Sequence, residues 1–98
     1  MTDTSALTAL LGEKVFIRTV TYHAIGHVES VAGGFVQLST ASFVADTGYG
    51  AGHRYSDTLR DGFGRNAEYD PFPDDLYVAT AAIVDVTLWR HALPTTAQ

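Results

Sequence analysis

The sequence predicts a mainly β fold: a small five-stranded barrel with a short N-terminal helix and a long loop between its third and fourth strands. Residues 15–44 form a β-rich run broken by single glycines, where a strand must bend or reverse. Two further β-type runs, 76–80 and 82–89, follow a glycine-rich stretch. With 98 residues, 46% of them hydrophobic, the chain has interior for one core, so we expect a single domain over residues 1–98.

The first element is a helix over residues 5–11. Thr4 or Ser5 can cap it, Gly12 is a typical C-terminal stop, and its apolar face is formed by Leu7, Leu10 and Leu11. A helix this short is not stable alone, so we expect it to lie as a lid across an open end of the barrel.

Three strands in a meander follow the helix. Residues 14–22 carry apolar groups on both faces, as expected for a strand that is covered on both sides. Residues 25–30 form the second strand, in which Gly26 permits a sharp bend. The pair Gly33-Gly34 is a turn signal before the third strand, residues 35–40.

Residues 46–75 read as an inserted loop. Five of the nine glycines lie in this stretch, at positions 48, 50, 52, 62 and 64. Ser56 can cap one helical turn through Asp61, which Gly62 would end. A structureless loop of this length is unusual in so small a domain, so we expect it to be partly ordered and to serve a purpose.

Composition excludes several functional classes. The net charge of −5 and only six scattered Lys and Arg residues argue against a surface that neutralises many phosphates. The chain has no cysteine for a disulfide or a thiolate metal site. The first residues lack a basic region and a long apolar run, so no signal peptide or membrane span is expected, and the host cytoplasm or a virion is the expected location.

The order of elements resembles the small barrel of Sm and LSm proteins, a relative in shape of SH3-like barrels. Gly26 and Val28 stand where the first Sm motif has its glycine and an apolar position, followed by Phe35, Val36 and Leu38 at further apolar positions. Residues 83–86 stand where the second motif would lie. Ala32 and Gly33 replace the Asp and Asn of the first motif's loop, so the RNA binding that the resemblance implies lacks its usual residues.

A second resemblance is to a family of small uncharacterised proteins of tailed phages and prophages. It is carried by four segments that span most of the chain: FIRTVT (16–21), GGFVQLSTASFVADTG (33–48), PFPDD (71–75) and IVDVTLWRHALP (83–94). The resemblance implies a virion or assembly component, without implying an activity or site residues.

A metal-assisted hydrolase is one alternative function. His23 and His27 stand four positions apart, and His53 in the loop could complete a ligand set. The histidines lie in β-type sequence, where the same spacing is typical of polar residues at a strand end or an interface. No nucleophile motif accompanies them, so the sequence predicts no catalytic residue and no cofactor.

An RNA-binding ring is the other alternative, with Arg18 and Arg54 as the residues that would contact RNA. The chain is rich in aromatic side chains, which could stack on bases beside these cations. Aromatic residues and arginine are equally typical of protein interfaces, and the acidic balance favours that interpretation.

Asp85 interrupts an apolar strand, and we expect it to cap a turn, pair with an arginine or lie on an exposed face.

We therefore expect a non-enzymatic structural or assembly protein that forms a homo-oligomer, with a ring as one closed form. Unpaired edge strands near residues 35–44 and 82–89 would make the contact. The expected partners are further copies of the chain and other phage structural proteins, not a membrane, and nucleic acid only in the alternative above. The expected interface residues are Phe35, Val36, Leu38, Phe43, Val84, Val86 and Trp89.

Overall fold

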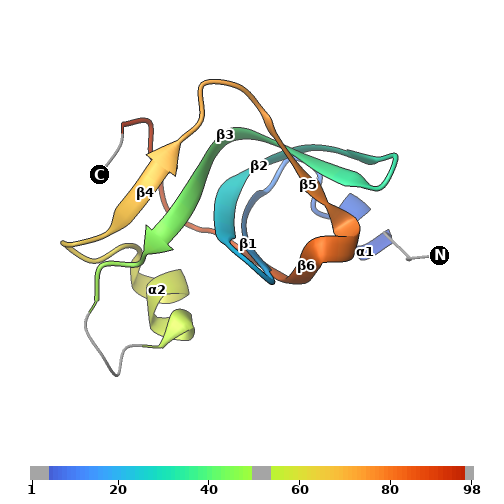
Figure 1. The fold of residues 1–98 in the computed structure, drawn as a ribbon. Coiled ribbons are helices and arrows are strands. Elements are labelled where there is room, and N and C mark those ends of the chain that lie inside the picture. Colours follow the sequence, from blue (N-terminus) through green and yellow to red (C-terminus); the bar gives the residue numbers. More distant parts are fainter. Residues whose placement is uncertain (1–4, 50–53, 97–98) are drawn as a thin grey trace.

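Six antiparallel strands form one open sheet in the computed structural model, which describes residues 5–49 and 54–96 (Figure 1). The sheet order is β4, β3, β2, β1, β6, and β5 pairs with β3 beside β4. The mainly β prediction is confirmed. The strands are β1 (Lys14–Thr19), β2 (His23–Ala32), β3 (Phe35–Asp46), β4 (Glu68–Pro71), β5 (Leu76–Ala79) and β6 (Ile83–Leu88).

The predicted count of five strands is wrong, and the sheet does not close into the predicted small barrel. Strand β4 lies inside the stretch that the sequence assigned to a loop, and with β5 it shares one edge of β3. Pro71 is the last residue of β4 and Pro73 lies between the two short strands, and neither proline can donate to a sheet ladder. In the described residues β6 pairs with β1 and not with β4 or β5, so the sheet stays open.

The long hairpin of β2 and β3 shapes the sheet. It turns at Gly33 and Gly34, whose φ angles of 61° and 84° favour glycine, as the sequence predicts. Between the pairs Ile25–Ser42 and His27–Ser39, β3 carries one extra residue. Thr40 has a φ of 48° at this β-bulge. The bulge bends β3, so that the sheet curves strongly (Figure 1).

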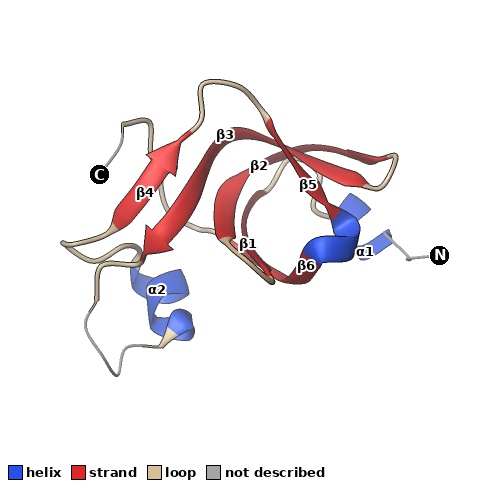
Figure 2. Cartoon of the chain, in the orientation of Figure 1, coloured by secondary structure: helices blue, strands red, loops and turns tan. Residues whose placement is uncertain are grey.

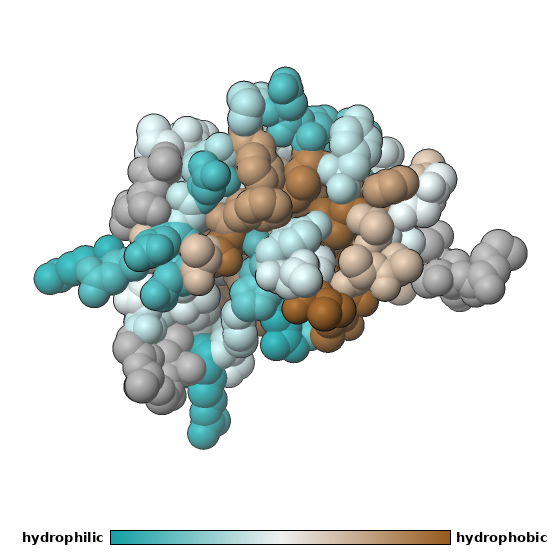
Figure 3. All heavy atoms as spheres, in the orientation of Figure 1, coloured by the Kyte–Doolittle hydropathy of each residue, from teal (hydrophilic) through white to brown (hydrophobic). Residues whose placement is uncertain are grey.

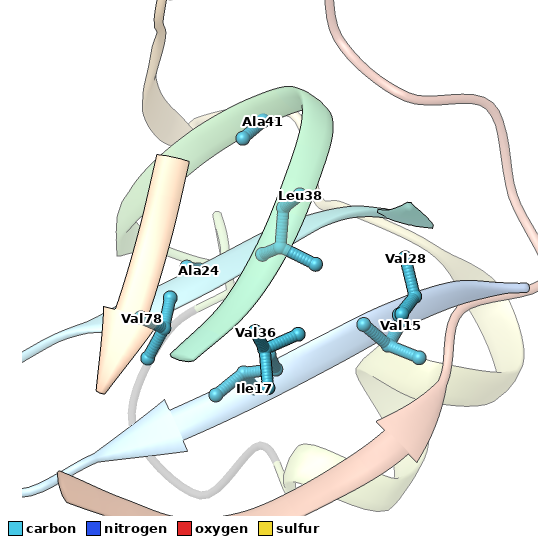
Figure 4. Close-up of a cluster of buried hydrophobic side chains, with 8 residues drawn as sticks. All are labelled: Val15, Ile17, Ala24, Val28, Val36, Leu38, Ala41 and Val78. Carbon is cyan, nitrogen blue, oxygen red and sulfur yellow. The ribbon is translucent and has the colours of Figure 1, made fainter. Parts of the chain in front are cut away.

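Two apolar clusters lie on opposite faces of the sheet. The inner cluster is aliphatic and is formed by Val15, Ile17, Ala24, Val28, Val36, Leu38, Ala41 and Val78 (Figure 4). The outer cluster contains Phe16, Ile25, Val44 and Trp89. Because β1 contributes Val15 and Ile17 to one face and Phe16 to the other, the expectation that this strand is covered on both sides is confirmed.

Each of the two described helices packs against one of these clusters, and Figure 2 marks where the helices lie. Helix α1 (Ser5–Thr8) is shorter than predicted, and Leu7 and Leu10 of its turn pack against the inner cluster. Helix α2 (Tyr55–Asp61) ends at Gly62, as predicted, and Leu59 packs against the outer cluster. A 3-10 turn, η1 (Thr80–Ala82), joins β5 to β6. Neither described helix combines the length and hydropathy that a membrane crossing requires.

Substitution of Gly26 by Ala should destabilise the fold. A Cβ at this position would lie 2.9 Å from Leu38 Cβ and 3.1 Å from the Ser39 carbonyl oxygen, so β2 and β3 would have to separate. We expect the free energy of unfolding to fall by about 1–3 kcal/mol in chemical denaturation. Ala45→Val, an added bulk on an exposed position of β3, is the control and should change it by less than about 0.5 kcal/mol. Equal effects would contradict the close approach of the two strands.

Candidate functional site

Strand β6 has an unpaired edge. In the described part of the chain it pairs with β1 alone, and Trp89 N donates to Lys14 O at 2.9 Å. Hydrogen-bonded and non-hydrogen-bonded pairs alternate along an antiparallel ladder. Val86 and Leu88 therefore direct their backbone N–H and C=O groups away from β1. These groups can pair with another strand.

Strand β5 has a second unpaired edge. Thr80 N donates to Gly34 O at 2.9 Å, which fixes the alternation along the β3–β5 ladder. By the same argument Tyr77 and Ala79 direct their backbone groups away from β3. No proline lies in β5 or β6, so neither edge is blocked in the way that proline blocks a strand.

Strand β4 differs from the other two edges. Phe72 N donates to Ala41 O at 2.8 Å, and the alternation then places Pro71 where an N–H would point outward. Proline lacks that donor, so a strand added to this edge would meet an unsatisfied position. Proline and the exposed Asp70 blunt β4, whereas the described edges of β5 and β6 are open to pairing.

The expected interface residues do not share one surface. Val84 on β6 is 61% exposed and Phe35 on β3 is 46% exposed, so both are available to a partner. The expectation for Val36, Leu38 and Trp89 is wrong in this fold, because all three are buried in the clusters that hold the sheet together.

Phe43 and Val86 are partly buried beside the inner cluster. Tyr77, which is 58% exposed on β5 between Leu76 and Val78, was not among the expected interface residues. LYVA is apolar at every position, so no alternation of apolar and polar residues marks Tyr77 as the exposed one. Figure 3 shows apolar atoms over β6 and across the middle of the face that the figure presents.

A polar cluster joins α2 to the outer face of the sheet. Arg18 on β1 pairs with Asp85 on β6, and its Nε lies 2.9 Å from each carboxylate oxygen. The guanidinium also lies over the ring of Tyr55, 5.1 Å from its centroid. The Tyr55 hydroxyl and Nδ1 of His23 share a hydrogen bond of 2.6 Å. Pairing with an arginine, one of the three expectations for Asp85, is therefore confirmed.

The charges in this cluster shift the ionisation of its members. The hydrogen bonds from Arg18 lower the pKa of Asp85, and the same pair raises the pKa of Arg18. Burial lowers the pKa of His23, and the nearby Arg18 lowers it further. Burial also raises the pKa of Tyr55. At neutral pH the cluster therefore holds one ion pair beside a neutral imidazole and a neutral phenol.

A cavity of about 220 Å³ opens beside this cluster, where the end of β3 meets α2. Its walls include His23, Asp46, Arg54 and Thr58. The Oγ1 of Thr58 is buried and makes no hydrogen bond to any described residue. A buried hydroxyl in a polar cavity is commonly paired with an ordered water.

The histidines do not form a metal centre in the described residues. His23 contacts Tyr55, whereas Nδ1 of His27 pairs with Glu29 at 2.9 Å. Four residues of extended strand separate the two backbones by roughly 13 Å. His53 lies outside the described residues, and within 5–49 and 54–96 no three His, Cys, Asp or Glu side chains are grouped as metal ligands would be.

The two arginines expected for RNA lie close to α2. Arg18 is engaged with Asp85 and with the ring of Tyr55, so its charge is largely neutralised. Arg54 is exposed and immediately precedes α2. The pairing with Asp85 leaves Arg18 with little net positive charge for phosphate groups.

Substitution His23→Gln should weaken the pH dependence of stability. Because the pKa of His23 lies below its ordinary value of 6.5 in the folded chain, the unfolded chain takes up this proton first as the pH falls. His23 therefore lowers the free energy of unfolding as the pH drops below about 6.5, and it has no such effect at higher pH.

Denaturant midpoints measured between about pH 7.5 and pH 5 should fall less steeply in His23→Gln than in the wild type. This window lies above the range in which Asp85 and Glu29 titrate, since the pKa values of both carboxylates are lowered. His27→Gln, on the same strand but away from α2, is the control. An unchanged slope in His23→Gln would contradict the assigned environment of this ring.

Comparison with protein-family models and with curated proteins gives no match to this chain. The resemblances to Sm-like barrels and to phage proteins therefore stay predictions.

Proposed function

We propose that this chain is a non-enzymatic structural or assembly protein that forms a homo-oligomer through its two unblocked sheet edges. The observation that carries the proposal is the open sheet, in which β5 and β6 each lack a partner along one edge among the described strands. Unpaired edges of this kind are templates for pairing with another strand.

The two edges favour a head-to-tail contact between copies. Because β5 and β6 are different strands, pairing β5 of one copy with β6 of the next uses two different surfaces. Such contacts close into a ring when the rotation between copies permits it. Val84 and Tyr77, both largely exposed in the single chain, would lie at the joint and would gain burial there.

The setting is a tailed phage or prophage, with other structural proteins of the particle as additional partners. Support for this part is the four sequence segments that resemble small phage proteins. The acidic net charge and the neutralised Arg18 support assembly over the binding of RNA.

The mass of the purified chain in solution tests the proposal. Light scattering coupled to size exclusion should give a multiple of the mass of one chain at micromolar concentration. Val84→Lys and Tyr77→Lys each place a charge at one of the two edges and should shift the protein towards the monomer, because a charge buried at a joint is costly.

Val20→Lys is the matched control. Val20 is 82% exposed at the tip of the β1–β2 hairpin and belongs to neither edge, so this variant should keep the wild-type mass. A wild-type monomer would overturn the proposal. If both edge variants keep the wild-type mass, the contact between copies lies on another surface.

A further inference from the structure

Three aromatic rings form a continuous row on one side of the inner cluster. Tyr22 lies 4.7 Å from Phe43 between ring centroids, and Phe43 lies 4.5 Å from Phe72. The rings come from three separate segments: the end of the β1–β2 hairpin, strand β3 and the residue after β4. Each ring is only partly buried, so the row keeps an accessible side.

A hollow lies at each end of this row. The first, of about 410 Å³, is lined by the tip of the β1–β2 hairpin and by the β3 residues Phe43, Val44 and Ala45. The second, of about 280 Å³, is lined by residues 72–76. We call the row with its two hollows the aromatic groove. Because strand β3 forms one wall of the first hollow, this part of the groove exists before a partner arrives.

The groove has an acidic rim. Asp74 and Asp75 are exposed in the wall of the second hollow, and Asp75 is held in place by Gln37, whose Nε2 donates to it at 2.7 Å. No Lys or Arg is among the described residues that line either hollow. The aromatic rings of the row lie beside Asp74 and Asp75, whose charges no described Lys or Arg in the hollows neutralises. This arrangement favours a partner segment in which an apolar side chain stands next to a Lys or Arg.

We propose that the aromatic groove binds a segment of another protein that inserts an aliphatic or aromatic side chain against Phe43 and Phe72 and places Lys or Arg beside Asp74 and Asp75. The apolar anchor supplies most of the binding free energy, since aromatic side chains dominate interface energetics. The exposed carboxylates select basic partners, and their contribution weakens as salt is added. The groove borders β5 at Leu76 but includes neither Tyr77 nor any residue of β6, so the native mass of the groove variants distinguishes this site from the oligomer contact.

The test uses a short synthetic peptide in which lysines flank a Leu-Phe-Leu core, together with a matched peptide in which glutamates replace the lysines. Titrated into the full chain at low salt, the lysine peptide should shift the amide NMR signals of Tyr22, Phe43 and Leu76, and the glutamate peptide should not. Binding of both peptides equally, or of neither, would overturn the proposal.

Charge reversal provides the second arm. The double variant Asp74→Lys, Asp75→Lys changes two exposed side chains and should weaken binding of the lysine peptide at least tenfold. The control, Glu13→Lys with Asp61→Lys, makes the same change in net charge at exposed residues that line neither hollow. Equal loss in the two variants would show that total charge, and not the groove, attracts the peptide.

The variant Phe72→Ala tests the apolar floor, and its amide spectrum and unfolding midpoint show whether it folds. A folded Phe72→Ala protein that binds the lysine peptide as the wild type does would overturn the proposal. A lower native mass in the Asp74→Lys, Asp75→Lys variant would also overturn it, because the occupant of the groove would then be a second copy of the chain.

Discussion

The pairing of β3 with three other strands holds the sheet together. One edge of β3 pairs with β2, while the other edge pairs with β5 near its start and with β4 near its end. A straight β3 could not pair with both β4 and β5 and also curve around the inner cluster. The bulge at Thr40 supplies the bend, and it keeps Leu38 and Ala41, three residues apart, in the same inner cluster.

The two faces of this sheet are stabilised by different means. The buried centre of the inner face is aliphatic, and its contribution comes from the burial of apolar surface. The outer face carries aromatic rings, and at its border the pair Arg18–Asp85 joins β1 to β6. Both side chains of this pair remain more than a third exposed, so water screens the pair and its contribution to stability is small. Its main effect is to position the guanidinium over Tyr55 and so to hold α2.

The features that the sequence predicted depend on local signals, whereas the features that it did not predict depend on contacts between residues far apart in the chain. The Gly33-Gly34 turn and the end of α2 at Gly62 depend on neighbouring residues only, and both were predictable. Strand β4 was not, because EYDP has a proline and no apolar alternation. In the run FVQL, Phe35 shares its face of the strand with the polar Gln37, whereas Val36 and Leu38 share the other face, so Gln37 was the only local sign that Phe35 is exposed while Val36 is buried. The contact between His23 and Tyr55 joins residues 32 positions apart and needed the fold.

The pairing of β6 with β1 sets the order in which the chain can fold. Arg18 and Asp85 are 67 residues apart in the sequence, whereas the β2–β3 hairpin closes over two glycines. Closing the longer loop costs more chain entropy before any contact compensates it. We therefore expect the hairpin to form early and β6 to join late. During that interval the outward edge of β1 is exposed, so a nascent chain is most open to mispairing with another copy before its last strand has been made.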